Sequence, residues 1–275
     1  MSPDRAKSAR EVLAFYVEAG VDAAIGETAN DYLSAPAPAA APPDALSGGG
    51  DTPAARPALV MPRNLETKGG ATPPPAIPEA AVMAAREAAR SAASLDELRD
   101  ILDRFDGCAL KATASRLVFA DGNPQARLMF VGEAPGREED IEGLAFVGRS
   151  GKLLDQMLKA IGLDRTQAYI ANIVPWRPPG NRTPTPVETQ ICLPFIQRQI
   201  ELANPDILIC IGQPSTAALL RVQGIMKNRG RWFPYDTGTR EIRAMPMLHP
   251  AYLLRTPIAK RLAWRDFLAI KKALG

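Results

Sequence analysis

The stretch Ala126-Arg127-Leu128-Met129-Phe130-Val131-Gly132-Glu133-Ala134-Pro135-Gly136 is the most informative part of the chain. Its first seven residues, which are not charged except for Arg127, predict a buried strand, and the residues after them predict a loop. The same alternation continues to the C-terminus. We expect further strands at 168–174, 207–212 and 242–248, and helices at 150–161, 186–202, from about 214, and at 258–274. Strands separated by helices predict an α/β fold, a three-layer sandwich whose central four-stranded, mostly parallel sheet has helices on both faces.

The sequence before this domain differs in composition. Residues 1–33 predict a helical segment, because apolar residues recur near helical spacing. Residues 34–78 hold 11 of the 26 prolines, and such a segment cannot bury enough apolar surface to offset its chain entropy. We interpret it as a flexible linker, with a Pro-rich motif for a partner domain as the alternative. The α/β domain then covers 79–275 and starts with a helix, about 78–105, that breaks near the capping box of Ser94 and Glu97.

The composition excludes some classes of protein. The 275 residues carry a net charge of +3, with a pI near 8.8, which suits a polyanionic partner without demonstrating one. No apolar run approaches the ~20 residues of a membrane span, and the charged N-terminus does not resemble a secretory signal. Three cysteines do not suggest a disulfide framework. We therefore expect a cytoplasmic protein that does not bind membranes.

Polar side chains lie at or near the ends of three of the expected strands. His249 is the only histidine and comes directly after a strand, Glu133 lies between two glycines after another, and Asn172 lies within a third. Each alone has a structural explanation, since a lone histidine is more often structural than catalytic and a buried amide can brace a core. Ligands of open α/β sheets bind beyond the carboxyl ends of the strands, however, and these three residues would meet there.

Five segments in this order resemble the bacterial and archaeal family-four uracil-DNA glycosylases. They are Gly132-Glu133-Ala134-Pro135-Gly136 with Arg137-Glu138-Glu139-Asp140, then Phe146-Val147-Gly148, Asn172 before Arg177-Pro178-Pro179-Gly180-Asn181-Arg182, Cys192-Leu193-Pro194-Phe195, and His249-Pro250-Ala251-Tyr252-Leu253-Leu254. The resemblance covers about 105–275. It implies an enzyme of base excision repair that hydrolyses the N-glycosidic bond of uracil in DNA and leaves an abasic site, with other deaminated bases as further candidate substrates.

The resemblance also implies roles for residues that bind the base and act on it. Asn172 would recognise the Watson–Crick edge of the flipped uracil, and Phe146 would stack on its ring. His249 would donate to a carbonyl oxygen of the base and stabilise the departing anion. Glu133, with the backbone around Ala134, would orient or activate the attacking water.

Further residues would contact the DNA. Ser150 and Lys152, at an expected helix start, would hold phosphates, because free backbone N–H groups there favour anions. The loop from Leu253 to Arg255 would press into the duplex where the base was. The expected partner is DNA that contains uracil, bound by a monomer, and the N-terminal segment is a candidate tether for a protein partner.

The chain departs from the family at its metal site. A typical member binds a four-iron, four-sulfur cluster with four cysteines, and the matching positions here are Phe105, Cys108, Trp176 and Cys192. Such clusters normally need four thiolates. We therefore expect no cofactor and no metal, with Phe105 and Trp176 filling the space, while Cys210 is expected to be an inert core residue.

The sequence leaves the base specificity and two alternative functions open. Gly136 stands where other uracil-DNA glycosylases carry a bulky tyrosine that bars thymine, so exclusion of altered bases could be looser. A catalytically weak damage-binding protein of the same fold is one alternative function. A nucleoside N-glycosidase is another, although a set of cations favours a DNA backbone. This set is Arg221, Lys227, Arg229, Arg231 and Arg255.

Overall fold

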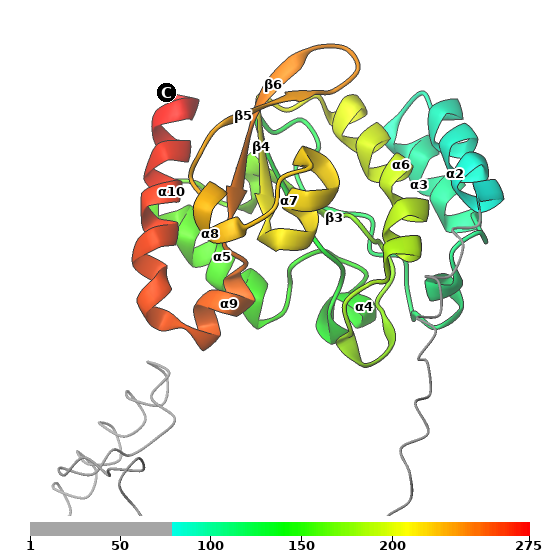
Figure 1. Cartoon of the computed structure of the whole chain (residues 1–275), viewed down its shortest axis with the longest axis horizontal. Coiled ribbons are helices and arrows are strands. Elements are labelled where there is room, and N and C mark those ends of the chain that lie inside the picture. The colour runs from blue at the N-terminus through cyan, green and yellow to red at the C-terminus, as the bar shows by residue number, and fades with distance from the viewer. Residues whose placement is uncertain (1–78) are drawn as a thin grey trace, which may run out of the picture. The chain divides into compact units, whose positions relative to one another are not determined.

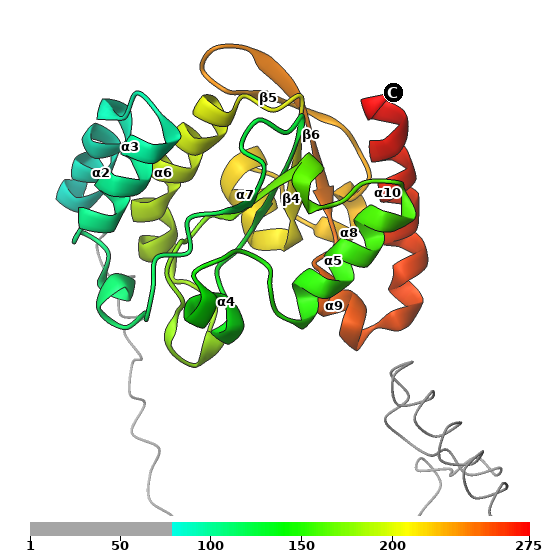
Figure 2. The same ribbon diagram turned by 180° about the vertical axis from the view of Figure 1, so that it is seen from behind.

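The computed structural model describes residues 79–275, so the predictions for 1–33 and 34–78 lie outside the described residues. Helices cover both faces of one sheet, with α6 (Pro186–Ala203) on one side and α5 (Arg149–Ala160) and α10 (Lys260–Leu274) on the other (Figures 1 and 2). The expected three-layer α/β fold is confirmed. Within this part of the chain, no helix is both long and apolar enough to cross a membrane.

The sheet has six strands in the order β1-β3-β2-β4-β6-β5. They are β1 (Asp121–Gly122), β2 (Leu128–Gly132), β3 (Ala168–Asn172), β4 (Ile207–Ile211), β5 (Phe233–Asp236) and β6 (Glu241–Met247). The four central strands β3, β2, β4 and β6 are parallel, as expected. The expected number of strands was too low, because antiparallel β1 and β5 were missed at the two edges. One has two residues and the other contains Pro234, so neither produces a clear apolar pattern.

Most of the expected helices are present at nearly the predicted residues. The first one is broken as predicted, into α2 (Glu79–Ser91) and α3 (Leu95–Arg104). Ser94 caps α3, since its Oγ accepts from the Glu97 N–H at 3.2 Å and the Glu97 carboxylate accepts from the Ala93 N–H at 2.7 Å. The remaining helices are α4 (Arg137–Glu142), α7 (Gly212–Leu220), α8 (Ile225–Asn228) and α9 (Pro250–Arg255).

The sheet separates two apolar cores, because successive side chains of a strand point to opposite faces. Met129 and Val131 of β2 belong to the core beneath α2, α3 and α6. Leu128 and Phe130 belong to the core on the side of α5 and α10. All five residues of each of β2, β3 and β4 are buried, as is typical of parallel strands covered on both faces. The rigid strands bring their carboxyl ends to one edge, where the candidate site lies.

Candidate functional site

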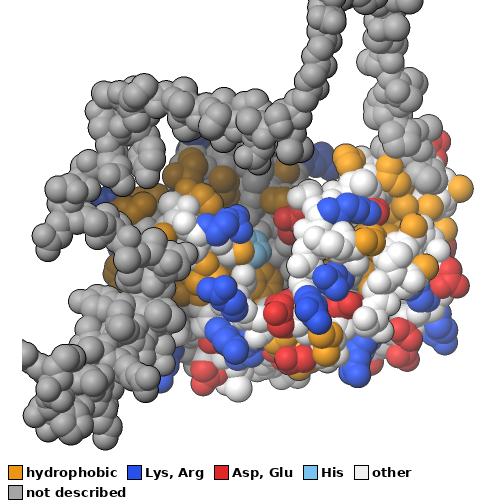
Figure 3. Space-filling model, turned by 90° about the horizontal axis from the view of Figure 1, so that it is seen from below, with side chains coloured by type: hydrophobic (Ala, Val, Ile, Leu, Met, Phe, Trp, Pro, Cys, Tyr) orange, Lys and Arg blue, Asp and Glu red, His pale blue; other side chains and the backbone are white. Residues whose placement is uncertain are grey.

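A cavity of about 590 Å³ opens at the carboxyl ends of the parallel strands. Glu133 follows β2, Asn172 ends β3, Gly212 follows β4 and His249 follows β6, and all four line the cavity. Figure 3 shows the histidine within a hollow that has lysine and arginine side chains on both sides. The structure therefore brings together the three polar residues that the sequence placed at strand ends.

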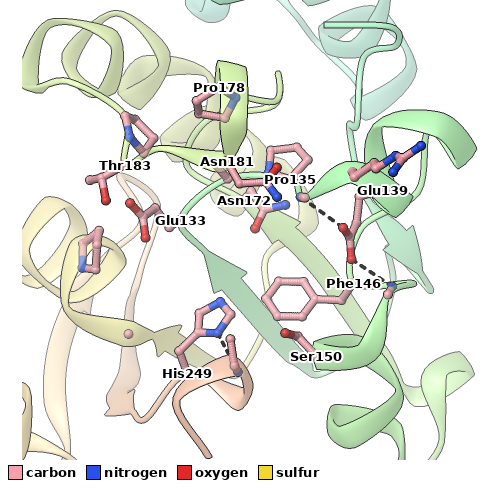
Figure 4. Close-up of a pocket in the computed structure, with 18 of the residues that line it drawn as sticks. Glu133, Pro135, Glu139, Phe146, Ser150, Asn172, Pro178, Asn181, Thr183 and His249 are labelled. Atoms are coloured by element: carbon pink, nitrogen blue, oxygen red, sulfur yellow. Dashed lines mark hydrogen bonds between the residues drawn. The ribbon is translucent and has the colours of Figure 1, made fainter. Parts of the chain in front are cut away.

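His249 is held in one tautomer. It caps α9, and its Nδ1 accepts a hydrogen bond from the Ala251 N–H at 3.1 Å. Burial, followed by the positive charge of Arg255, lowers the pKa of His249 to about 4. The ring is thus neutral at pH 7, and its proton must be on Nε2 because Nδ1 acts as an acceptor. A neutral N–H donor is available to a molecule in the cavity (Figure 4).

One carboxyl oxygen and one amide oxygen in the cavity have no hydrogen-bond partner. Among the described residues, Glu133 Oε1 and Asn172 Oδ1 are the buried side-chain atoms that lack a hydrogen bond. Burial raises the pKa of Glu133, and a hydrogen bond from Thr183 partly opposes this effect. Leaving a buried polar atom unpaired costs roughly 1–3 kcal/mol. Orphaned acceptors that line a cavity are typical of a site whose ligand supplies the donors.

Phe146 lies beside the histidine and closes the cavity with its ring. The two ring centroids are 5.7 Å apart and the planes differ by 28°. Phe146 has a positive φ of 55°, which is uncommon for a residue other than glycine and is often found at functional sites. Gly132 makes room for this arrangement, because a Cβ at that position would lie 2.5 Å from Asn172 Oδ1 and 2.7 Å from the Phe146 ring.

Glu139 of α4 holds two loops of the cavity together, a role that was not expected from the sequence. Its Oε2 accepts from the Gly136 N–H at 3.0 Å and its Oε1 from the Gly148 N–H at 2.9 Å (Figure 4). One carboxylate thus ties the loop after β2 to the start of α5. A glycine followed three residues later by glutamate at a helix start is a recognisable capping pattern, and this signal could have identified the residue.

A third loop, residues 177–185, forms the opposite rim. Arg182 donates to both oxygens of Glu188, at 2.8 and 2.6 Å. This pairing lowers the pKa of Glu188, which also joins Thr185 in a capping box at the start of α6. The rim is therefore anchored to the longest described helix rather than being a free loop.

The four residues expected to contact DNA have different surroundings in the structure. Ser150 and Arg255 line the cavity, and Ser150 lies in the first turn of α5 as predicted. Lys152 is exposed on the same helix but does not line the cavity. Leu253 is completely buried in a small apolar core, so in this structure its side chain is not exposed for contact with a duplex. Tyr252, its neighbour on that helix, lines the cavity instead.

One of the cations that favoured DNA over a nucleoside is also engaged elsewhere. Arg229 donates through Nε to Asp266 at 2.9 Å and through Nη2 to the Leu262 carbonyl at 2.7 Å. Its fixed position within this network removes it from the expected set of phosphate contacts.

The positions that match the family's cluster ligands form a packed core. Cys108 and Cys192 are buried with their Sγ atoms 3.8 Å apart. Phe105 meets Phe195 edge to face, with centroids 5.0 Å apart, and the side chain of Trp176 is almost completely buried. Two thiols among carbon side chains do not fit a four-iron, four-sulfur cluster, which needs four ligands. Cys210 is buried within β4, as expected of an inert core residue.

Comparisons with known proteins agree with the resemblance. A model of the Uracil DNA glycosylase superfamily matches residues 119–268. The chain is 38% identical to the Type-4 uracil-DNA glycosylase of Saccharolobus solfataricus, over 66% of this chain and 87% of that protein. It is 35% identical to the Type-4 enzyme of Archaeoglobus fulgidus, over 66% and 94%, and 41% identical to that of Thermotoga maritima, over 58% and 85%.

Proposed function

Because this chain belongs to the uracil DNA glycosylase superfamily, we propose that it hydrolyses the N-glycosidic bond of uracil in DNA and leaves an abasic site. A base inside a duplex cannot reach the cavity, so the nucleotide must be extruded at a cost of a few kcal/mol. The convergence of a neutral N–H donor on His249 with the orphaned oxygens of Glu133 and Asn172 is the observation that carries this proposal.

Asn172 and Phe146 would bind the flipped base. The Asn172 amide offers an acceptor for the uracil N3–H and a donor for O4, a pairing that cytosine cannot form at both positions. The Phe146 ring would stack on the base, and stacking of this kind contributes roughly 1–3 kcal/mol. The backbone around Ala134 completes the base-binding wall. This arrangement would select uracil by hydrogen bonding rather than by size alone.

His249 would act on the leaving group. As the C–N bond breaks, negative charge grows on the uracil ring and positive charge on the sugar. A donor fixed where charge develops stabilises the transition state more than the ground state. The Nε2–H of His249 fits this role because the ring is neutral and its other nitrogen is already occupied by the Ala251 N–H.

Glu133 would act on the water. Its carboxylate has an unpaired buried oxygen and a raised pKa, so it is a stronger base than an exposed glutamate. In the ionised form it would orient the attacking water and accept its proton. The same negative charge would stabilise the positive sugar in the transition state.

The DNA backbone would lie along the rim of the cavity. The first turn of α5, which includes Ser150, presents backbone N–H groups without an acceptor in the helix, a favourable place for a phosphate. Lys152 would add charge further along the same helix. Tyr252 and Arg255 of α9, rather than Leu253, would face the duplex.

The proposal extends to the cofactor, the compartment, the oligomeric state and the partners of the protein. We propose that the enzyme works without a cofactor or metal, since the donor set around Cys108 and Cys192 does not fit the family's cluster. We also propose a cytoplasmic monomer that binds uracil-containing DNA, with the N-terminal segment as a tether for a protein partner. One duplex site needs no symmetry in the protein.

The test is cleavage of a labelled oligonucleotide with one uracil, single- and double-stranded, by the wild type and by His249→Ala, followed by alkali. We expect uracil-dependent breaks that fall sharply in the variant. Binding without breaks by folded wild type would instead favour the damage-binding alternative. Activity on deoxyuridine that does not depend on salt would favour the nucleoside alternative, because DNA binding weakens steeply with salt.

A further inference from the structure

Arg165 binds the backbone that carries Phe146. Its Nη1 donates to the Ala145 carbonyl at 2.9 Å and its Nη2 to the Phe146 carbonyl at 2.6 Å. Arg165 belongs to the short helical turn before β3 and does not line the cavity. It therefore reaches the site only through the residue that it holds.

Phe146 requires such support because of its backbone conformation. Its φ of 55° lies in the left-handed region, which residues other than glycine rarely adopt. The Phe146 carbonyl is also pressed against α5, where a Cβ on Gly151 would come within 1.5 Å of the carbonyl oxygen. Gly151 permits this conformation, and the two hydrogen bonds from Arg165 favour it over the relaxed alternatives.

Arg165 is itself fixed by two carboxylates. It forms an ion pair with Asp121 of β1, and its Nε donates to Asp155 of α5 at 3.0 Å. The guanidinium thus joins the edge strand, the helix and the Phe146 loop. A planar group with five donors can serve four acceptors in this way, whereas the point charge of a lysine cannot.

We propose that Arg165 is a positioning residue for base stacking, one that sets the place of the Phe146 ring in the cavity. The proposal rests on the proposed function, in which that ring stacks on the flipped base. Without the two hydrogen bonds, the Phe146 backbone relaxes and the ring leaves its place beside His249. The base is then held less accurately against the donor and the water.

A double-mutant cycle tests this proposal. We expect Arg165→Ala to lower kcat/KM on uracil-containing DNA roughly 10–100-fold, the size of effect that misplaced groups produce. In a Phe146→Ala background, Arg165→Ala should have little further effect, because its role acts through the ring that is already absent. Additive losses, or an unchanged kcat/KM in Arg165→Ala, would overturn the proposal. If the alanine variant does not fold, Arg165→Lys replaces it in the same cycle, because lysine keeps the positive charge but lacks the planar guanidinium.

A matched control and an independent readout complete the test. Arg229 also bonds a carboxylate and a backbone carbonyl, yet it lies outside the cavity lining, so Arg229→Ala should lose stability while keeping kcat/KM below its unfolding temperature. His249 is the only histidine, so its ring gives one assignable NMR signal in tag-free protein, shifted by the stacked Phe146 ring. Arg165→Ala should move this signal and Arg229→Ala should not; an unmoved signal rejects the proposal. This readout holds even if the wild type proves inactive on uracil, which would reject the proposed function alone.

Discussion

The Ala251 N–H donates to Nδ1 of His249 at 3.1 Å, and this one bond fixes which nitrogen of the only histidine carries a proton. The donor is two residues further along the chain, in the first turn of α9, so the helix start determines the tautomer. A ring oriented in this way presents Nε2–H to the cavity without any change of protonation.

Removal of the Nε2–H donor of His249 should slow the chemical step. We expect His249→Ala to lower the single-turnover rate roughly 10²–10³-fold, the usual effect of losing one donor to a developing oxyanion. His249→Gln, whose amide can still donate, should lose less. Binding of abasic DNA should change little in both variants, and a large loss of binding with unchanged chemistry would contradict the assigned role.

The pH dependence of the rate should report Glu133. Burial raises the pKa of this carboxyl above its ordinary value, and only the ionised form can act on water, so the rate should rise with pH through that raised pKa. The pKa of His249 is lowered to about 4, so the ring is essentially neutral between neutral and mildly acidic pH and contributes no further change in this range. The profile of Glu133→Gln should be lower and flat in this range; an unchanged acidic limb in that variant would assign the limb to another group.

Replacement of the base-reading amide should change specificity. Asn172→Asp loses the donor to uracil O4 and gains an acceptor that suits the amino group of cytosine. We expect uracil excision to fall roughly 100-fold or more, as is usual when a buried polar partner is left unpaired. Competition between uracil and cytosine oligonucleotides measures the ratio, and an unaltered preference for uracil would show that another group reads the base.

A single methyl group beneath the cavity should damage the site. In Gly132→Ala the new Cβ would lie 2.5 Å from Asn172 Oδ1 and 2.7 Å from the Phe146 ring, so both side chains must leave their places. We therefore expect loss of uracil excision in a folded protein. Gly162→Ala is the control for the added methyl group, since no atom lies within 4 Å of the new Cβ there, although the φ of Gly162, +84°, is itself restrictive. It should cost about 1 kcal/mol of stability and no activity.

The metal content is a direct check on the core around Cys108. Protein purified without oxygen should contain no iron and show no visible charge-transfer absorption, since two thiols cannot replace four. Serine at Cys108 and Cys192 should leave the rate of excision unchanged. Iron in stoichiometric amounts, lost together with activity in these variants, would reject the metal-free assignment.

The residues of the parallel sheet could be predicted because burial on both faces leaves a simple record in the sequence. β2 and β4 are unbroken apolar runs, so their positions were predicted within about two residues. Glu133, Asn172 and His249, at the ends of β2, β3 and β6, lie at one edge of the sheet as predicted. Edge strands leave a weaker record, which explains why β1 and β5 were missed.

Contacts between distant segments could not be predicted in this way. Arg165 and Phe146 are 19 residues apart, and no periodicity connects a guanidinium to a carbonyl in another loop. The burial of Leu253 was not expected from the sequence either. It lies in a segment that the resemblance assigned to DNA, but helical geometry points it inward while Tyr252 faces the cavity. Which side of a short helix meets the core depends on packing partners that a local pattern does not contain.

Phe105 and Trp176 pack in the same hydrophobic core as Cys108 and Cys192. A core without a cluster, as we propose here, would form from the polypeptide alone and would need no supply of iron and sulfide. In the metal-free protein that we propose, oxidants that attack iron–sulfur clusters would find no inorganic target there. Deamination of cytosine continues during oxidative stress and iron starvation, and an enzyme built in this way would keep its repair capacity under those conditions.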